Sequence, residues 1–279
     1  MNHLQIPDEL KGEELYKFLK TNKAILTAQK KYTVKCGDAI SLSGYCVNEK
    51  GEVTKGNNPV TEDVNNLNVA LVINTTNWMD SHSDVHFPGL WKKSLSENKG
   101  LYLLQEHQMT FKGIITDEIK AFTTKMSWQS LGLPLMGETE ALVFNAVISK
   151  SRNEFMFNEY RMGRVKNHSV GMKYVNIDMA INDDGKYYIE EKDVWDKYIE
   201  QVANKQEAID QGYFWAVTQA KVVEGSAVPI GSNTITPTLE NNIKAANSTV
   251  DIQPPQGTGE TQPQFDFLQF IQETKFINI

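Results

Sequence analysis

Residues 166–180, KNHSVGMKYVNIDMA, predict a long β-strand with a serine, Ser169, near its start. Apolar residues alternate at Val170, Met172 and Tyr174, which is the period of a strand with one face in a core. After Tyr174 the apolar phase moves by one residue and continues at positions such as Ile177. Because strand side chains change face at every residue, this change predicts a bulge or bend near Tyr174.

The rest of the chain predicts more strands than helices. Strand-like runs separated by Gly, Asn and Pro occupy residues 31–47, 67–75, 100–108, 119–128 and 141–149. Helical periodicity occupies residues 8–20, 151–164 and 189–211. In the second of these helices Ser151 stands at the start, with Glu154 at the spacing of a capping box. The pattern predicts a β-rich α+β core domain.

Two segments flank this core domain, which we place at residues 32–240. Residues 1–31 form a helical N-terminal arm, and residues 241–279 form a tail rich in Pro, Gly, Gln and Thr. The tail composition predicts a flexible tether, because it offers little apolar surface to bury. It ends in an apolar cluster that includes Phe267 and Phe270, which either docks onto a partner or packs back onto the domain.

Charge and cysteine content limit the classes of function. The 279 residues carry a net charge of −7, which argues against a nucleic-acid partner because phosphates require a basic face. No apolar run approaches the roughly 20 residues that cross a bilayer, and the N-terminus lacks the apolar stretch of a signal peptide. Cys36 and Cys46 are the only cysteines and fit neither a disulfide framework nor a zinc site. We therefore expect a reduced, cytoplasmic protein with two buried thiols in adjacent strands.

Ser169 is either an ordinary strand residue or a nucleophile. A serine hydroxyl reacts only when a base takes its proton, and that base is usually remote in sequence. His107 is a candidate base because it ends the run LYLLQEH, an apolar strand that turns polar at its last residues, and a strand end would expose it on a rigid support. His168 is poorly placed, since strand neighbours point to opposite faces, and Lys173 is a more distant alternative.

A separate signal is the alternation of acidic residues and histidines in MDSHSDVHFPG. Asp80, His82, Asp84 and His86 would lie on one side of an extended strand, and their side chains are good ligands for a divalent metal. The segment is equally compatible with a solvated loop, because its Ser and Asp content favours turns.

Four motifs in the same order resemble those of tailed-phage prohead serine proteases, the capsid maturation proteases related to herpesvirus assemblins. They are SDVHFPGLWKKSL, LYLLQEHQMTFKGII, NHSVGMKYV and VVEGSAVPIGSNTITP, and the resemblance spans residues 32–240. It implies a closed β-barrel with flanking helices, in which residues 189–211 are a helical insertion. It also implies that Ser169 is the nucleophile, His107 the base and Glu224 the third member. Backbone N–H groups near Val170 and Gly171 are our expectation for part of the oxyanion hole.

The resemblance further implies an endopeptidase that works inside the assembling procapsid, in the host cytoplasm. Its substrates would be the scaffolding protein or a scaffold-like arm of the major capsid protein, and usually the protease itself. A second copy of the chain is a further candidate partner. No metal, cofactor, membrane or nucleic acid is required. The alternatives are a catalytically silent scaffolding protein with a protease-like fold and a metal-binding domain at residues 80–86.

Overall fold

The computed structural model describes residues 4–40, 45–47, 53–55, 65–97, 100–131 and 133–229. In these ranges the α-helices are α1 Gly12–Thr21, α2 Lys23–Tyr32, α3 Lys92–Glu97, α4 Glu154–Arg161, α5 Ile189–Tyr198 and α6 Lys205–Gln211. The strands are β1 Lys35–Ile40, β2 Tyr45–Val47, β3 Val53–Lys55, β4 Asn66–Thr75, β5 Asp84–His86, β6 Leu103–Gln105, β7 Ile114–Thr116, β8 Ile119–Ser127, β9 Glu138–Ser149, β10 Asn167–Ile181 and β11 Tyr213–Val228. The mixture of helices with predominant strands agrees with the sequence prediction.

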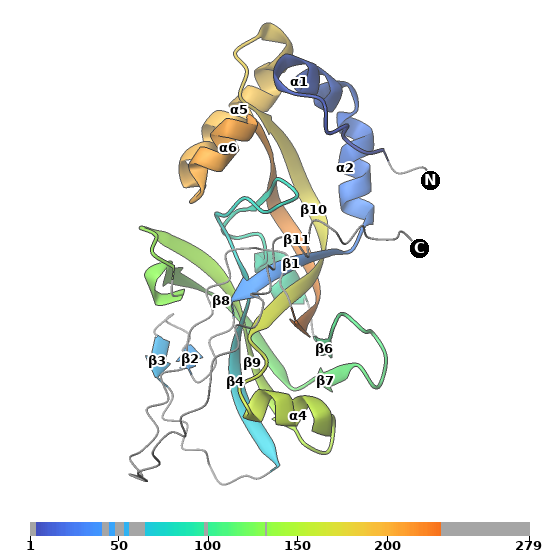
Figure 1. The fold of residues 1–279 in the computed structure, drawn as a ribbon, viewed down its shortest axis with the longest axis vertical. Helices are drawn as coiled ribbons and strands as arrows, with labels where there is room; N and C mark the ends of the chain where they lie inside the picture. The colour runs from blue at the N-terminus through green and yellow to red at the C-terminus, as the bar shows by residue number, and fades with distance from the viewer. Residues whose placement is uncertain are drawn as a thin grey trace, which may run out of the picture. The chain divides into compact units, whose positions relative to one another are not determined.

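The two longest strands, β10 and β11, lie side by side and antiparallel (Figure 1). Their register shifts at three places, of which one lies between Tyr174 and Asn176 and the next between Asn176 and Ile177. The bulge predicted near Tyr174 is therefore confirmed. The remaining shift falls between Gly171 and Met172, where Gly171 is opposite Glu224 and Met172 is opposite Val222.

The sheet that contains these strands has the order β1-β10-β11-β6-β7, with β5 also paired to β11. β1 is antiparallel to the first part of β10, so that part of β10 is an inner strand. β5 and β6 both run parallel to β11, beside residues 215–217 and 225–227 respectively. The whole of β6 therefore lies beside the last residues of β11, and the turn that follows β6 starts at the same place.

A second sheet, with the order β4-β9-β8, packs against the first through one apolar core. The core contains fully buried Ile73 and Phe144 from the second sheet and Val170, Met172 and Val222 from the first. The pairings found in the described ranges form separate open sheets, together with the β2–β3 pair. Closure into a barrel stays a prediction.

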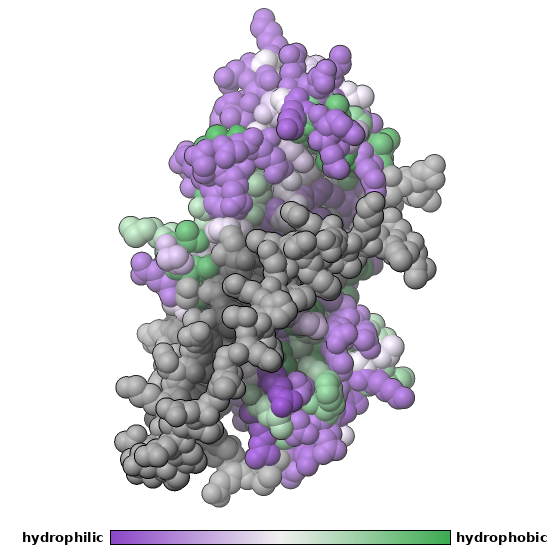
Figure 2. Space-filling model, viewed as in Figure 1, coloured by the Kyte–Doolittle hydropathy of each residue, from purple (hydrophilic) through white to green (hydrophobic). Residues whose placement is uncertain are grey.

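The N-terminal arm contains two helices, whereas the sequence pattern predicted only the first. α1 and α2 are joined to α5 by the carboxylate of Glu191, which lies 2.5 Å from both Lys20 Nζ and Lys23 Nζ. Farther along α2, Lys30 Nζ contacts the buried carboxylate of Asp84. Figure 2 shows a mainly hydrophilic surface over α1, α5 and α6.

Two predicted helices differ from the structure. α4 spans only Glu154–Arg161, and Asn153 caps it by accepting a hydrogen bond from the Met156 N–H at 3.0 Å. Ser151 lies outside the helix, because the Asn153 side chain satisfies the free N–H group first. The single helix predicted over 189–211 is interrupted after Tyr198, passes through a short 3₁₀ turn and resumes as α6.

Some predictions concern parts of the chain outside the described residues, which include all residues from 230 onward, and with them the whole tail predicted at 241–279, and the side chains of Cys36 and Cys46. Those cysteines are on β1 and β2, which belong to different sheets rather than to one neighbouring pair. No helix in the described ranges is long and apolar enough to cross a membrane.

Candidate active site

His107 lies in the turn that follows β6, not at the strand end where the sequence placed it. β6 ends at Gln105, and Glu106 and His107 both have positive φ angles, of 51° and 58°. Such angles are uncommon for residues other than glycine, so neighbouring contacts must hold them. The Glu106 N–H donates to the Ala227 carbonyl at 2.9 Å, and the His107 N–H donates to Ser226 Oγ at 3.1 Å. The end of β11 thus fixes the turn.

The imidazole of His107 contacts the carboxylate of Glu224. His107 Nδ1 is 2.7 Å from Glu224 Oε1, and the Glu224 side chain is 5% exposed while that of His107 is 25% exposed. Because an ionised carboxylate only accepts hydrogen bonds, this contact favours the tautomer with the proton on Nδ1. Nε2 then carries the lone pair that can take a proton, as a general base requires.

The strand register brings Ser169 to the same face of the sheet as Glu224. Ser169 is directly opposite Ser226, and Gly171 is directly opposite Glu224. Residues two apart on a strand share a face, so these four positions face one side while Val170 and Met172 face the core. Ser169 and Glu224 therefore lie on one face of the β10–β11 pair, and His107 contacts that face through Glu224.

Ser226 is a member of this site that the sequence reasoning missed. Its hydroxyl donates to Glu224 Oε2 at 2.6 Å, so both carboxylate oxygens have a hydrogen-bonding partner. Ser226 is fully buried. The signal that could have found it is the spacing E-x-S at 224–226 in a strand, which places both side chains on the same face.

The two rival bases lie elsewhere. His168 is fully buried on the opposite face, with Nε2 2.7 Å from the hydroxyl of Tyr160 on α4. Burial lowers the pKa of His168 to about 3, so its ring is neutral near pH 7. Lys173 is exposed and opposite Lys221, and four residues of strand separate it from Ser169 by about 13 Å. Neither side chain is arranged to deprotonate Ser169.

The strand pairing of β10 does not support the expectation that the N–H groups of Val170 and Gly171 form part of an oxyanion hole. Both residues are paired with β1 on one side and β11 on the other. Backbone N–H groups of an inner strand point toward neighbouring strands and are consumed by ladder hydrogen bonds. Successive N–H groups along the strand point to opposite neighbours, so each would have to leave its own ladder bond, to β1 or to β11, before it could stabilise an oxyanion.

The acidic and histidine side chains at residues 80–86 do not line up on one side, which corrects the metal-ligand interpretation. Residues 80–83 form a turn, with a φ of 62° at Ser83, and only Asp84–His86 is a strand. Asp84 accepts a hydrogen bond from the Tyr174 hydroxyl at 2.9 Å, and His86 lies between Tyr174 and Asn74, whereas His82 is exposed. Across the described ranges, no group of three or more potential metal-ligating side chains occurs.

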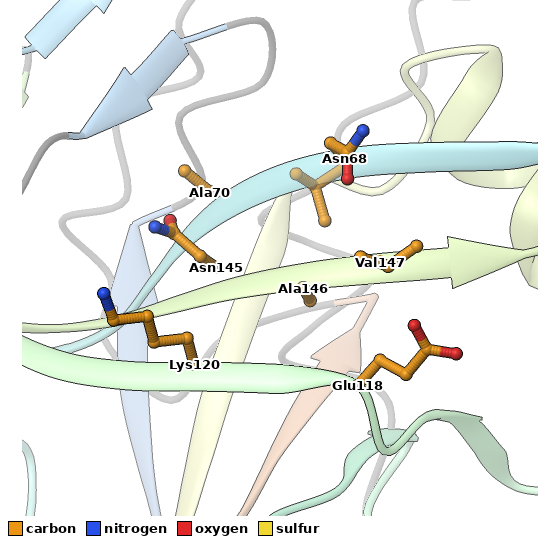
Figure 3. Close-up of a pocket in the computed structure, with 8 residues that line it drawn as sticks. Asn68, Ala70, Glu118, Lys120, Asn145, Ala146 and Val147 are labelled. Atoms are coloured by element: carbon orange, nitrogen blue, oxygen red, sulfur yellow. The ribbon is translucent and has the colours of Figure 1, made fainter. Parts of the chain in front are cut away.

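Two hollows differ in their relation to this site. One of about 250 Å³ lies beside the His107 turn and is lined by Gln105, Glu106, Phe155, Met156, Glu159, Arg164, Val165, Ala227, Val228 and Pro229. A larger one, of about 430 Å³, lies over β4, β9 and β8, where Ala70, Asn145 and Lys120 are opposed across the three strands (Figure 3). None of the candidate catalytic residues lines the larger hollow.

Comparison with known proteins identifies no relative of this chain. No protein-family model, curated protein or solved structure matches it.

Proposed function

We propose that this protein is a serine endopeptidase that cleaves scaffold or capsid-protein arms, and itself, during maturation of a viral procapsid. The observation that carries the proposal is the 2.7 Å contact between His107 Nδ1 and Glu224, on the sheet face that also contains Ser169. A serine, a histidine and a carboxylate in this relation are the components of a nucleophilic triad.

In the proposed reaction, Ser169 Oγ attacks the scissile carbonyl carbon while its proton passes to His107 Nε2. The imidazolium that forms is stabilised by Glu224 through Nδ1–H. His107 then returns the proton to the leaving amine, which releases one product and leaves an acyl ester on Ser169. Water activated by the same histidine hydrolyses the ester. The proposed cycle uses no metal or organic cofactor.

The proposed substrates follow from the motif resemblance, which implies the scaffolding protein, the major capsid protein and the protease itself. The same resemblance underlies the expected assemblin-like closed barrel and the expected location in a procapsid in the host cytoplasm. The 250 Å³ hollow supports a peptide substrate, because apolar Phe155, Met156 and Val165 line it directly beside the His107 turn.

Intact-mass spectrometry over time, on wild type and Ser169→Ala, tests the proposal. We expect the wild type to shorten, above all within residues 240–265, while Ser169→Ala stays whole. The virus's scaffolding protein, added to both proteins, provides the substrate in trans. Equal trimming of both proteins, or no cleavage of either chain or of scaffold, would refute the proposed protease.

A catalytically silent scaffolding protein is the second candidate function, and the burial of Ser169 favours it. Ser169 is only 2% exposed, so a substrate can reach the hydroxyl only after a local movement. A fluorophosphonate probe separates the two candidates, because it labels an activated serine and ignores an ordinary one. Labelling of the wild type but not of Ser169→Ala excludes the silent scaffold.

A further inference from the structure

A closed set of hydrogen bonds connects the backbone of His107 to its own imidazole. The His107 N–H donates to Ser226 Oγ at 3.1 Å, and the Ser226 hydroxyl donates to Glu224 Oε2 at 2.6 Å. The other carboxylate oxygen, Oε1, is 2.7 Å from His107 Nδ1. The Ser226 hydroxyl therefore donates its single proton to Glu224 and accepts a hydrogen bond from the His107 N–H, so both bonds can form together.

This arrangement constrains two parts of the site at once. His107 has a φ of 58°, a left-handed conformation that costs energy for a residue other than glycine. The bond from its N–H to Ser226 helps to hold that conformation. The short bond from Ser226 to Glu224 stops the carboxylate from rotating, and hydrogen bonds to charged groups are stronger than neutral ones.

We propose that Ser226 is a positioning residue that fixes the His107 backbone and the Glu224 carboxylate in one geometry, and so selects the Nδ1–H tautomer of His107. The catalytic consequence rests on the proposed function, but the tautomer does not. Ser226 acts only through His107 and Glu224.

Three variants separate this role from ordinary packing. Ser226→Ala removes the hydroxyl, and Ser226→Cys keeps nearly the same shape with a weak donor. The matched control is Ser94→Ala, which removes another buried serine that is bonded to β11, since Ser94 Oγ accepts from the Val222 N–H at 2.9 Å. Ser94 does not contact Ser226 through any of the described bonds, so its loss reports stability alone.

The first readout needs no enzymatic activity. Nitrogen-15 NMR of labelled histidine reports whether Nδ1 or Nε2 carries the proton. We expect the Nδ1–H form of His107 in the wild type and in Ser94→Ala, and a mixture of tautomers in both Ser226 variants. Retention of the wild-type tautomer in folded Ser226→Ala or Ser226→Cys would overturn the proposal.

The second readout is cleavage of a scaffold-derived peptide across a pH range. We expect kcat to fall about 10- to 100-fold in both Ser226 variants, with KM unchanged and the acidic limb of the pH profile moved, and no such change in Ser94→Ala. An inactive wild type with a Ser226-dependent tautomer would refute the protease while leaving the positioning role intact. An active enzyme with unchanged kcat and pH profile in the Ser226 variants would refute the positioning role while leaving the proposed protease intact.

Discussion

The carboxyl group of Glu224 occupies the space that a side chain at position 171 would fill. A Cβ atom built on Gly171 would lie 2.0 Å from Glu224 Oε1 and 2.7 Å from its Cδ. The two residues are cross-strand partners on β10 and β11, so the carboxyl group folds back over its partner's backbone. Glycine at 171 is therefore part of how Glu224 reaches His107.

Gly171→Ala should displace the Glu224 carboxylate and disconnect it from His107. We expect kcat to fall at least about 100-fold, because the imidazole loses its orienting partner. Gly225→Ala is the matched control on the opposite face of the same strand pair, where a new Cβ would lie 2.8 Å from the Phe144 ring. That variant should lose about 1–3 kcal/mol of unfolding free energy through overpacking and keep the His107 tautomer. Equal kcat in Gly171→Ala and wild type would contradict the role assigned to Gly171.

Glu224→Gln should abolish most activity without unfolding the protein. The amide is nearly the same size, but it removes the negative charge that stabilises the imidazolium, and it can donate a hydrogen bond to Nδ1 and so favour the wrong tautomer. We expect a loss of about 10³- to 10⁴-fold in kcat. Peptide cleavage assays measure the loss of kcat, and circular dichroism checks that the variant stays folded. A drop of less than tenfold would show that Glu224 is not the orienting group.

Acid should destabilise the protein through His168. Its pKa in the folded state is about 3, because burial disfavours the charged ring, against about 6.5 when exposed. The unfolded chain therefore binds the proton more readily, and the contribution of His168 to stability is full above pH 6.5 and is lost as the pH falls toward 3. The loss is at most about 1.4 kcal/mol per pH unit.

Urea unfolding at pH 7, 5.5 and 4.5 measures this effect. The comparison is a double variant, His168→Phe with Tyr160→Phe, which removes the titrating group without leaving the Tyr160 hydroxyl unpaired. The double variant should lose less stability than the wild type between pH 7 and 4.5. Parallel profiles would mean that His168 is protonated in the folded protein at acid pH.

The N-terminal arm should detach when its lysines are removed. Glu191 is fully buried against Lys20 and Lys23, and these bonds lower the pKa of its carboxyl group despite burial. Lys20→Met with Lys23→Met leaves that carboxylate unpaired, at a cost of about 3–5 kcal/mol. Adding Glu191→Gln removes the stranded charge and should restore part of the stability. Thermal unfolding and limited proteolysis near residues 20–33 check whether stability falls from wild type to the triple variant to the double lysine variant.

Local patterns in the sequence determined much of the secondary structure and part of the site. Alternating apolar residues predicted β10 and its bulge near Tyr174, because burial of one strand face leaves a period of two that a bulge must break. The same alternation predicted that His168 and Ser169 point to opposite faces. Helix ends were less accurate, since the Asn153 cap competes with Ser151 and only local geometry decides between them.

Contacts between distant segments were decided by the tertiary structure alone. The sequence does not state that β6 runs parallel to the end of β11, yet that pairing places His107 against Glu224, 117 residues later. Nor does it state that Ser226 links the His107 backbone to the carboxylate, or that Gly171 makes room for Glu224. Side-chain periodicity is a local property of the chain, whereas strand register and hydrogen-bond partners depend on which remote segments share a core.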